Sequence, residues 1–221
     1  LHMIDRPLLV GEATLDRDVG VELSSDDLGG MGWLAYRLCV FGGEGKNRVA
    51  SEAGFLYVAR LQVNPLGAFD DSVEGDQERL PRPRLALGLA GAYNHNALRQ
   101  RGTQGTTYTL GGFDYVHAAA DLTFKWRGLY LFGEALYRGS DVAQHQGTVM
   151  GMAVREYTRS LWGYVAQAGV MLTDRLELTA RWEQAFALGD TDPALQATLR
   201  AQGNQVGAGV NWYQGGHGFK A

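Results

Sequence analysis

The chain has 221 residues, a formal net charge of −4 and a single cysteine. The mild negative charge argues against a nucleic-acid partner, and lone Cys39 excludes an internal disulfide. No run of about 18 apolar residues occurs, so the sequence holds no candidate transmembrane helix. Glycine is abundant at 31 residues and proline rare at five, which together with ten tyrosines favours a protein built of strands.

Alternation of apolar and polar residues recurs along the chain and predicts nine strands. In chain order they lie at 17–24, 33–40, 55–64, 84–93, 115–126, 128–138, 162–172, 176–186 and 205–213. The short polar segment 173–175 predicts a tight hairpin between the seventh and eighth strands. Residues 1–10 are a candidate tenth strand. Segment 192–202 begins with Asp-Pro and predicts a short helix within a loop.

The connections between these strands alternate in length. Those at 25–31, 126–128 and 173–175 are short, whereas 42–54, 94–113, 139–159 and 187–203 are long; the long connection 65–82 is the exception. An up-and-down meander places alternate connections at opposite ends, and outer-membrane barrels have short periplasmic turns and long extracellular loops. The pattern therefore predicts an all-β protein, an antiparallel up-and-down transmembrane β-barrel with about nine or ten strands present.

The polar positions of the strands carry both signs of charge. In a membrane barrel they face a water-filled lumen while the apolar positions face lipid. We therefore predict a pore lining made of Arg37, Arg60, Arg84, Lys125, Arg138, Arg181, Glu22, Asp121, Glu134, Glu177 and Glu183. In a soluble sheet these polar positions face bulk water instead. A non-channel β-barrel or β-sandwich with a binding or structural role therefore remains the alternative.

Two further groups of residues follow from the barrel interpretation. Aromatic residues near the strand ends predict interfacial girdles: Trp33, Phe55, Tyr93, Tyr115, Trp126, Tyr137, Trp162, Phe186 and Trp212. The long connections 94–113 and 139–159 are candidates for an inward-folding constriction. The basic loop residues that we expect at such a constriction are Lys46, Arg48, Arg99, Arg101, Arg155 and Arg159.

Patterns typical of catalysis or metal binding are incomplete. Segment 42–47, GGEGKN, has Val40 where a P-loop has its first glycine and lacks the Ser or Thr after Lys46. The acidic segment 70–81 ends on Pro81 where a calcium loop has Glu. The five histidines lie on separate elements without ligand spacing. We therefore predict no catalytic residue, no metal, no cofactor and no enzymatic activity.

Six stretches occur in an order and spacing that resemble the phosphate-selective porin O and P family. They are DRDVGVEL, VFGGEG, YVARLQVNPLG, RPRLALGLAGAYN, GYVAQAGVMLTDRLELTARWEQAF and NQVGAGVNWYQGGHGFKA. The resemblance covers nearly the whole chain. It implies a bacterial outer-membrane porin of sixteen strands, lying in the lipid bilayer, assembling as a homotrimer and passing small hydrophilic solutes, anions such as phosphate among them, by diffusion.

The resemblance also implies that residues 1–221 are a single barrel domain in fragment form, lacking the first strands and the closing C-terminal strand. With Asp18 added, the predicted wall offers six acidic and six basic groups, which gives no preference for anions. A phosphate-binding lysine cluster does not map onto the chain. The expectation carried forward is therefore porin function rather than phosphate selectivity.

Overall fold

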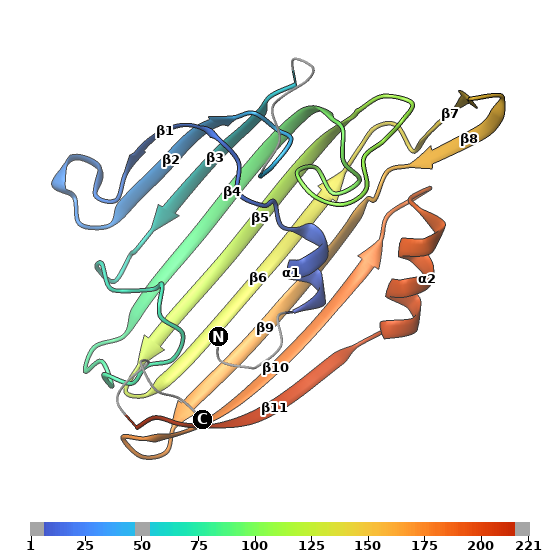
Figure 1. The fold of residues 1–221 in the computed structure, drawn as a ribbon. Coiled ribbons are helices and arrows are strands. Elements are labelled where there is room, and N and C mark those ends of the chain that lie inside the picture. The colour runs from blue at the N-terminus through green and yellow to red at the C-terminus, as the bar shows by residue number, and fades with distance from the viewer. Residues whose placement is uncertain (1–6, 47–53, 215–221) are drawn as a thin grey trace.

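A computed structural model of the chain describes residues 7–46 and 54–214. Its main feature is one antiparallel sheet of nine strands in the order β1-β2-β3-β4-β5-β6-β9-β10-β11 (Figure 1). The strands are β1 (Gly20–Ser25), β2 (Leu34–Phe41), β3 (Leu56–Val63), β4 (Arg84–Ala97), β5 (Phe113–Trp126), β6 (Leu129–Gly139), β9 (Leu161–Met171), β10 (Leu176–Ala187) and β11 (Gln205–Trp212). Two more strands, β7 (Gln144–Val149) and β8 (Met152–Tyr157), pair only with each other.

Each of the nine predicted strands corresponds to a strand of the large sheet, so the antiparallel meander is confirmed. The tight turn between β9 and β10 is also where it was expected. The turn between β5 and β6 has two residues with positive φ, Arg127 at 50° and Gly128 at 89°. That geometry matches the right-handed twist of the strands that it joins.

In residues 7–46 and 54–214, three helical segments accompany the sheet. The predicted loop helix is present as α2 (Pro193–Gln202), whose N-terminus is capped by the Asp192 side chain accepting from the Ala194 amide. A 3-10 turn, η1 (Leu28–Gly30), joins β1 to β2. The candidate tenth strand is wrong where the structure describes it, because residues 8–13 form helix α1 (Leu8–Ala13). The apolar run LLV at its start lacks the alternation of a half-buried strand.

The sheet is not closed into a barrel. Strands β1 and β11 are its two edges, and each pairs with one neighbour among the described residues. The prediction of a barrel is therefore confirmed only as an up-and-down antiparallel sheet. Helices α1 and α2 lie on the same side of this sheet (Figure 1). We call the face that they cover the inner face and the opposite one the outer face.

The register of the strands fixes which side chains share a face, because directly paired residues of antiparallel strands point the same way. A row of paired positions on the outer face is Leu23, Leu38, Ala59, Gly91, Ala118, Tyr137, Trp162 and Phe186. A row on the inner face is Gln62, Gly88, Asp121, Glu134, Val165, Glu183 and Gln205. All eleven predicted pore-lining residues lie on the inner face.

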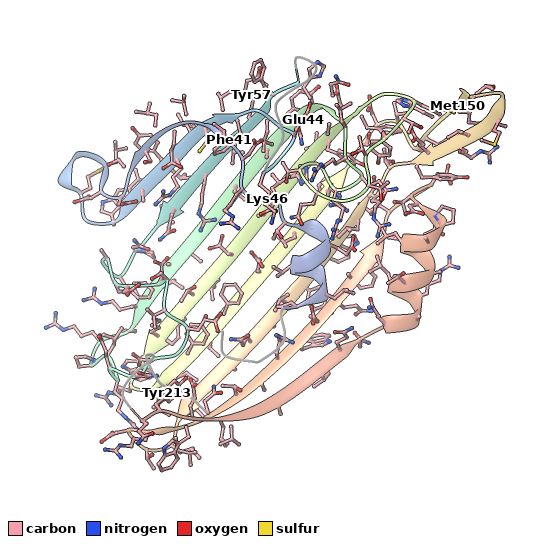
Figure 2. The ribbon with its side chains drawn as sticks, viewed as in Figure 1. Phe41, Glu44, Lys46, Tyr57, Met150 and Tyr213 are labelled. Atoms are coloured by element: carbon pink, nitrogen blue, oxygen red, sulfur yellow. The ribbon has the colours of Figure 1, made fainter. Side chains whose placement is uncertain are left out.

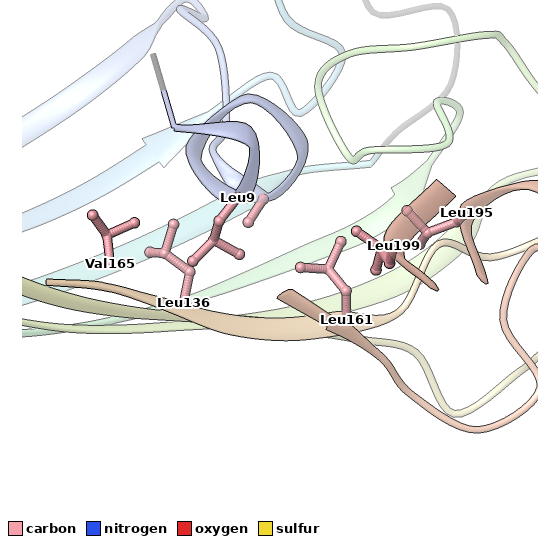
Figure 3. Packing of buried hydrophobic residues seen from close by; sticks show 7 residues of the cluster. Leu9, Leu136, Leu161, Val165, Leu195 and Leu199 are labelled. Atoms are coloured by element: carbon pink, nitrogen blue, oxygen red, sulfur yellow. The ribbon is translucent and has the colours of Figure 1, made fainter. Parts of the chain in front are cut away.

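The apolar core lies between the helices and the inner face at the long-loop end of the sheet (Figure 3). It consists of Leu9 and Ala13 of α1, Leu195 and Leu199 of α2, and Leu136, Leu161 and Val165 of the sheet. These three sheet residues interrupt the polar parity of the inner face. Helices cover the inner face at these three positions and exclude water from them.

Candidate functional site

The best-defined ion pair of the inner face joins β3 to β5. The two terminal nitrogens of Arg60 donate to the two carboxylate oxygens of Asp121 over 2.6 and 2.9 Å. Gly88 lies between them on β4, and a Cβ there would stand 2.4 Å from Arg60 Nη2 and 2.5 Å from the Asp121 carboxylate. The absence of a side chain at Gly88 therefore gives this two-point contact its space.

Three further ion pairs form between neighbouring residues. Arg37 donates to Glu22 over 3.0 Å and to Asp26 over 2.9 Å. Arg181 lies 3.9 Å from Glu183. The predicted lining charges are thus brought together as adjacent pairs along the sheet.

The remaining acidic candidates are Glu177 and Glu134. Glu177 accepts from Asn211 Nδ2 over 3.1 Å and from the Tyr213 hydroxyl over 2.6 Å. Glu134 pairs in the register with Asp121 and lines a cavity described below.

Lys125 and Arg84 hold a loop rather than line open space. The Lys125 ammonium donates to the carbonyl oxygens of Asp70 over 2.8 Å and Val73 over 2.6 Å, and its side chain is only 4% exposed. The Arg84 guanidinium donates to the Leu66 carbonyl. All three acceptors belong to residues 64–83, which connect β3 to β4 and which we call the acidic loop. Lys125 therefore lies on the predicted face but is covered by the acidic loop.

The acidic loop is anchored across the end of the sheet that carries the short turns. Buried Asp76 accepts from the Leu80 amide over 3.1 Å and from the Gly128 amide over 2.7 Å. Arg79 donates to the Met171 carbonyl over 3.1 Å, next to the turn between β9 and β10. These contacts explain why this connection alone broke the alternation of loop lengths: the loop folds back over the sheet instead of turning directly.

Arg138 is fully buried and holds helix α1. Its Nε donates to the Arg159 carbonyl over 2.7 Å, its Nη1 donates to the Glu12 carbonyl over 2.6 Å, and its side chain is 0% exposed. Arg101 donates to the Gly11 carbonyl over 2.9 Å. Carbonyls at the last turn of a helix lack partners within the helix and carry partial negative charge, so both arginines stabilise the end of α1. Arg138 is therefore on the predicted face but is covered.

Three of the other basic loop residues, Arg159, Lys46 and Arg99, contact nearby groups of the protein. Arg159 donates to Asp192 over 2.6 Å and to Glu12 over 3.1 Å. Lys46 lies 3.3 Å from Asp16 (Figure 2). Arg99 donates to the Thr103 carbonyl over 3.2 Å. Arg48 lies outside the described residues.

One of the two predicted constriction loops folds over the inner face. In connection 98–112, Gln104 donates to the Thr14 carbonyl over 3.1 Å, and Thr103 accepts from the Asp16 amide over 2.7 Å. It thereby fixes residues 7–17, which we call the strap, against the sheet. Neither the strap nor Glu12 had a signal in the sequence, because α1 is too short for a helical period to be recognised.

The other candidate constriction loop does not fold over the inner face. Residues 144–157 form the β7–β8 hairpin, which extends past the ends of β6 and β9 (Figure 1). Met150 at its tip is 95% exposed (Figure 2). Arg155 is exposed on this hairpin and contacts Tyr157 over 3.4 Å. Pairing between β7 and β8 satisfies backbone polar groups of this hairpin, and Glu156 accepts from the amides of Thr109 and Leu110.

A cavity of about 570 Å³ remains between the strap, the acidic loop and strands β6, β9 and β10. We call it the central cavity. Its ionisable side chains are Asp16, Arg17, Asp71, Glu74, Glu134 and Arg181, and Tyr130 and Phe132 form part of its wall. A hydrogen bond from the Arg17 amide lowers the pKa of Asp16, with a further contribution from Lys46, so this carboxylate is charged at neutral pH.

Eight of the nine aromatic residues that were expected to form girdles lie near the two ends of the sheet and are at least partly exposed. Phe55, Tyr93, Tyr137 and Trp162 are partly exposed at the long-loop end, with Phe186 stacked on Trp162, while Trp33, Trp126 and Trp212 are partly exposed at the short-turn end. The prediction for Tyr115 is wrong, because this residue is fully buried on the inner face. Its hydroxyl lies 2.8 Å from that of Tyr108. Burial and this neighbouring hydroxyl raise the pKa of Tyr108.

Within residues 7–46 and 54–214, no three His, Cys, Asp or Glu side chains are placed to hold a metal ion. No helix in the described part of the chain is both long and apolar enough to cross a membrane. No protein-family model, curated protein or solved structure matches this chain.

Proposed function

We propose that this chain forms part of the wall of a bacterial outer-membrane porin, through which small hydrophilic solutes diffuse. The observation that carries the proposal is the inverted polarity of the sheet. On the outer face Val21 is 76% exposed, Leu89 64% and Val210 60%, whereas Lys125, Arg138, Glu177 and Glu183 on the inner face are buried. A water-soluble sheet buries the opposite set.

The energetics of the two solvents favour this orientation. A charged side chain at the middle of the lipid face costs about 2–4 kcal/mol, whereas a lumen supplies water and charged partners. The inner face offers such partners, as in the contact of Arg60 with Asp121. The outer face presents leucine, valine and aromatic side chains across all its strands.

The two open edges are part of the proposal. Lipid-exposed sheet edges leave backbone amides and carbonyls without partners, and membranes do not tolerate them. We propose that further strands pair with β1 and β11 and complete the wall. The porin resemblance favours additional strands of a longer chain, and a second copy of this chain is the other source. Association into trimers rests on the resemblance alone.

The second candidate is a non-channel β-protein that binds a ligand on its inner face. It is favoured by the apolar cluster of α1 and α2 on that face, which looks like a soluble core. It leaves the outer face as a broad exposed apolar surface, far larger than the scattered residues or small patches of soluble proteins. We therefore rank it second.

Reconstitution tests the proposal. We expect the purified protein, with the strands that complete its wall present, to require detergent, to insert into planar bilayers and to produce stepwise ohmic conductance. We also expect liposomes that contain it to swell in a small neutral sugar such as arabinose, with heat-denatured protein as the control. Solubility without detergent, together with the absence of conductance and swelling, would favour the non-channel alternative.

A further inference from the structure

The acidic loop and the central cavity together indicate which ions the pore favours. We infer that the lumen prefers cations over anions and that the acidic loop sets this preference. The inference rests on the proposed channel function and adds a solute class to it. It concerns permeation rather than a bound ion.

The first observation is that the basic residues of the inner wall are engaged by the protein itself. Three of them pair with carboxylates: Arg37 with Glu22 and Asp26, Arg60 with Asp121, and Arg181 with Glu183. The other three, Arg84, Lys125 and Arg138, donate to backbone carbonyls. The ammonium of Lys125 and the guanidinium of Arg138 are buried beneath the acidic loop and the strap, away from a passing solute.

The second observation is the charge around the central cavity. Four carboxylates line it, from Asp16, Asp71, Glu74 and Glu134, against the two guanidinium groups of Arg17 and Arg181. The difference, four minus two, leaves a formal charge of −2 around the space that a solute must cross. Carboxylates reach it from both the strap and the acidic loop as well as from the wall.

The third observation is that the acidic loop is fixed in place. It carries five carboxylates, from Asp70, Asp71, Glu74, Asp76 and Glu78. Asp76 is used as an anchor to the Gly128 amide, and Asp71 accepts from Gln62 over 2.8 Å. The two arginines of the loop, Arg79 and Arg82, are not among the residues that line the cavity.

One carboxylate of the acidic loop has a lowered pKa. The Ser72 side chain, helped by the Ser72 amide, holds the pKa of Asp70 below its ordinary value. A cavity with an excess of one sign of charge between low-dielectric walls concentrates counter-ions and raises their rate of entry. Potassium and small organic cations should therefore pass more readily than chloride or phosphate.

The test is the reversal potential of the protein in planar bilayers under a potassium chloride gradient. We expect potassium preference in the wild type, and we expect D71N/E74Q to lower the potassium-to-chloride permeability ratio about threefold, since two lumen charges are lost. The control is D141N/D190N, which removes the same charge from exposed positions in the long-loop connections and should keep the wild-type ratio. Circular dichroism verifies that each variant is folded.

Chloride preference, an absence of preference, or an equal shift in both double variants would overturn the inference. Arabinose swelling separates this failure from that of the proposed function. Swelling without cation preference contradicts the inference alone and leaves the channel standing. The absence of both swelling and conductance contradicts the channel, and the inference with it.

Discussion

On the outer face, Leu23, Leu38 and Ala59 lie side by side across β1, β2 and β3. On the inner face of the same strands, Arg37 and Arg60 lie next to each other, and each turns to a different carboxylate. In the proposed porin the first surface faces lipid, and any apolar side chain suits it. The second surface needs specific partners at specific distances, because a buried charge without one is costly. The two faces should therefore respond differently to mutation.

Neighbouring residues of β3 should give the largest contrast. Leu61 points to the outer face and Gln62 to the inner face. We expect L61R to destabilise the inserted protein by about 2–4 kcal/mol, the cost of an arginine at mid-bilayer. Q62R introduces the same side chain on the inner face, close to Asp71, and should insert normally. Folding yield into liposomes, followed by heat-modifiable mobility on a gel, measures both; equal yields would remove the distinction between the faces.

Loss of the buried arginine should have the next largest effect. R138M leaves the carbonyls of Glu12 and Arg159 without their charged donor, which should cost about 1.5–3 kcal/mol. The strap should then open and be cleaved faster by trypsin, while urea unfolding occurs at a lower concentration. R155M makes the same exchange on the exposed β7–β8 hairpin and should change neither property. Equal protection of the strap in both variants would show that Arg138 does not hold it.

A smaller effect is expected from two glycines of β4. A Cβ at Gly91 has no neighbour nearer than 3.9 Å, so G91A should stabilise the strand by about 0.5 kcal/mol through lost flexibility of the unfolded chain. A Cβ at Gly88 displaces the contact between Arg60 and Asp121, so G88A should instead destabilise by about 1 kcal/mol. Urea unfolding in detergent compares them. A gain in stability for G88A would mean that this ion pair contributes little.

Much of the fold follows from period-two alternation. The nine strands, their order and the turn at 173–175 could be predicted because each strand has one polar and one apolar face. The same signal placed all eleven charged candidates on one face. Helix α2 could be predicted because Asp192 and Pro193 are a recognisable start.

The roles of the inner residues could not be predicted in the same way. Alternation states that Lys125 and Arg138 face inward, but their burial depends on residues 55 and 126 positions away in sequence, Asp70 and Glu12. The anomalous length of connection 65–82 was the available signal for the acidic loop. Tyr115 follows the inner parity of its strand, which outweighs its position near a strand end.

The most direct test of the account asks what surrounds each face of β4. Leu89 and Ala90 are adjacent, with Leu89 on the outer face and Ala90 on the inner face. Spin labels at L89C and at A90C, each in a C39A background in reconstituted liposomes, would be compared for collision with oxygen, which enters lipid, and with a water-soluble nickel chelate. The account predicts that oxygen broadens the label at position 89 and that the chelate broadens the label at position 90. Greater access of the chelate to position 89 than to position 90 would contradict the assignment of the outer face to lipid.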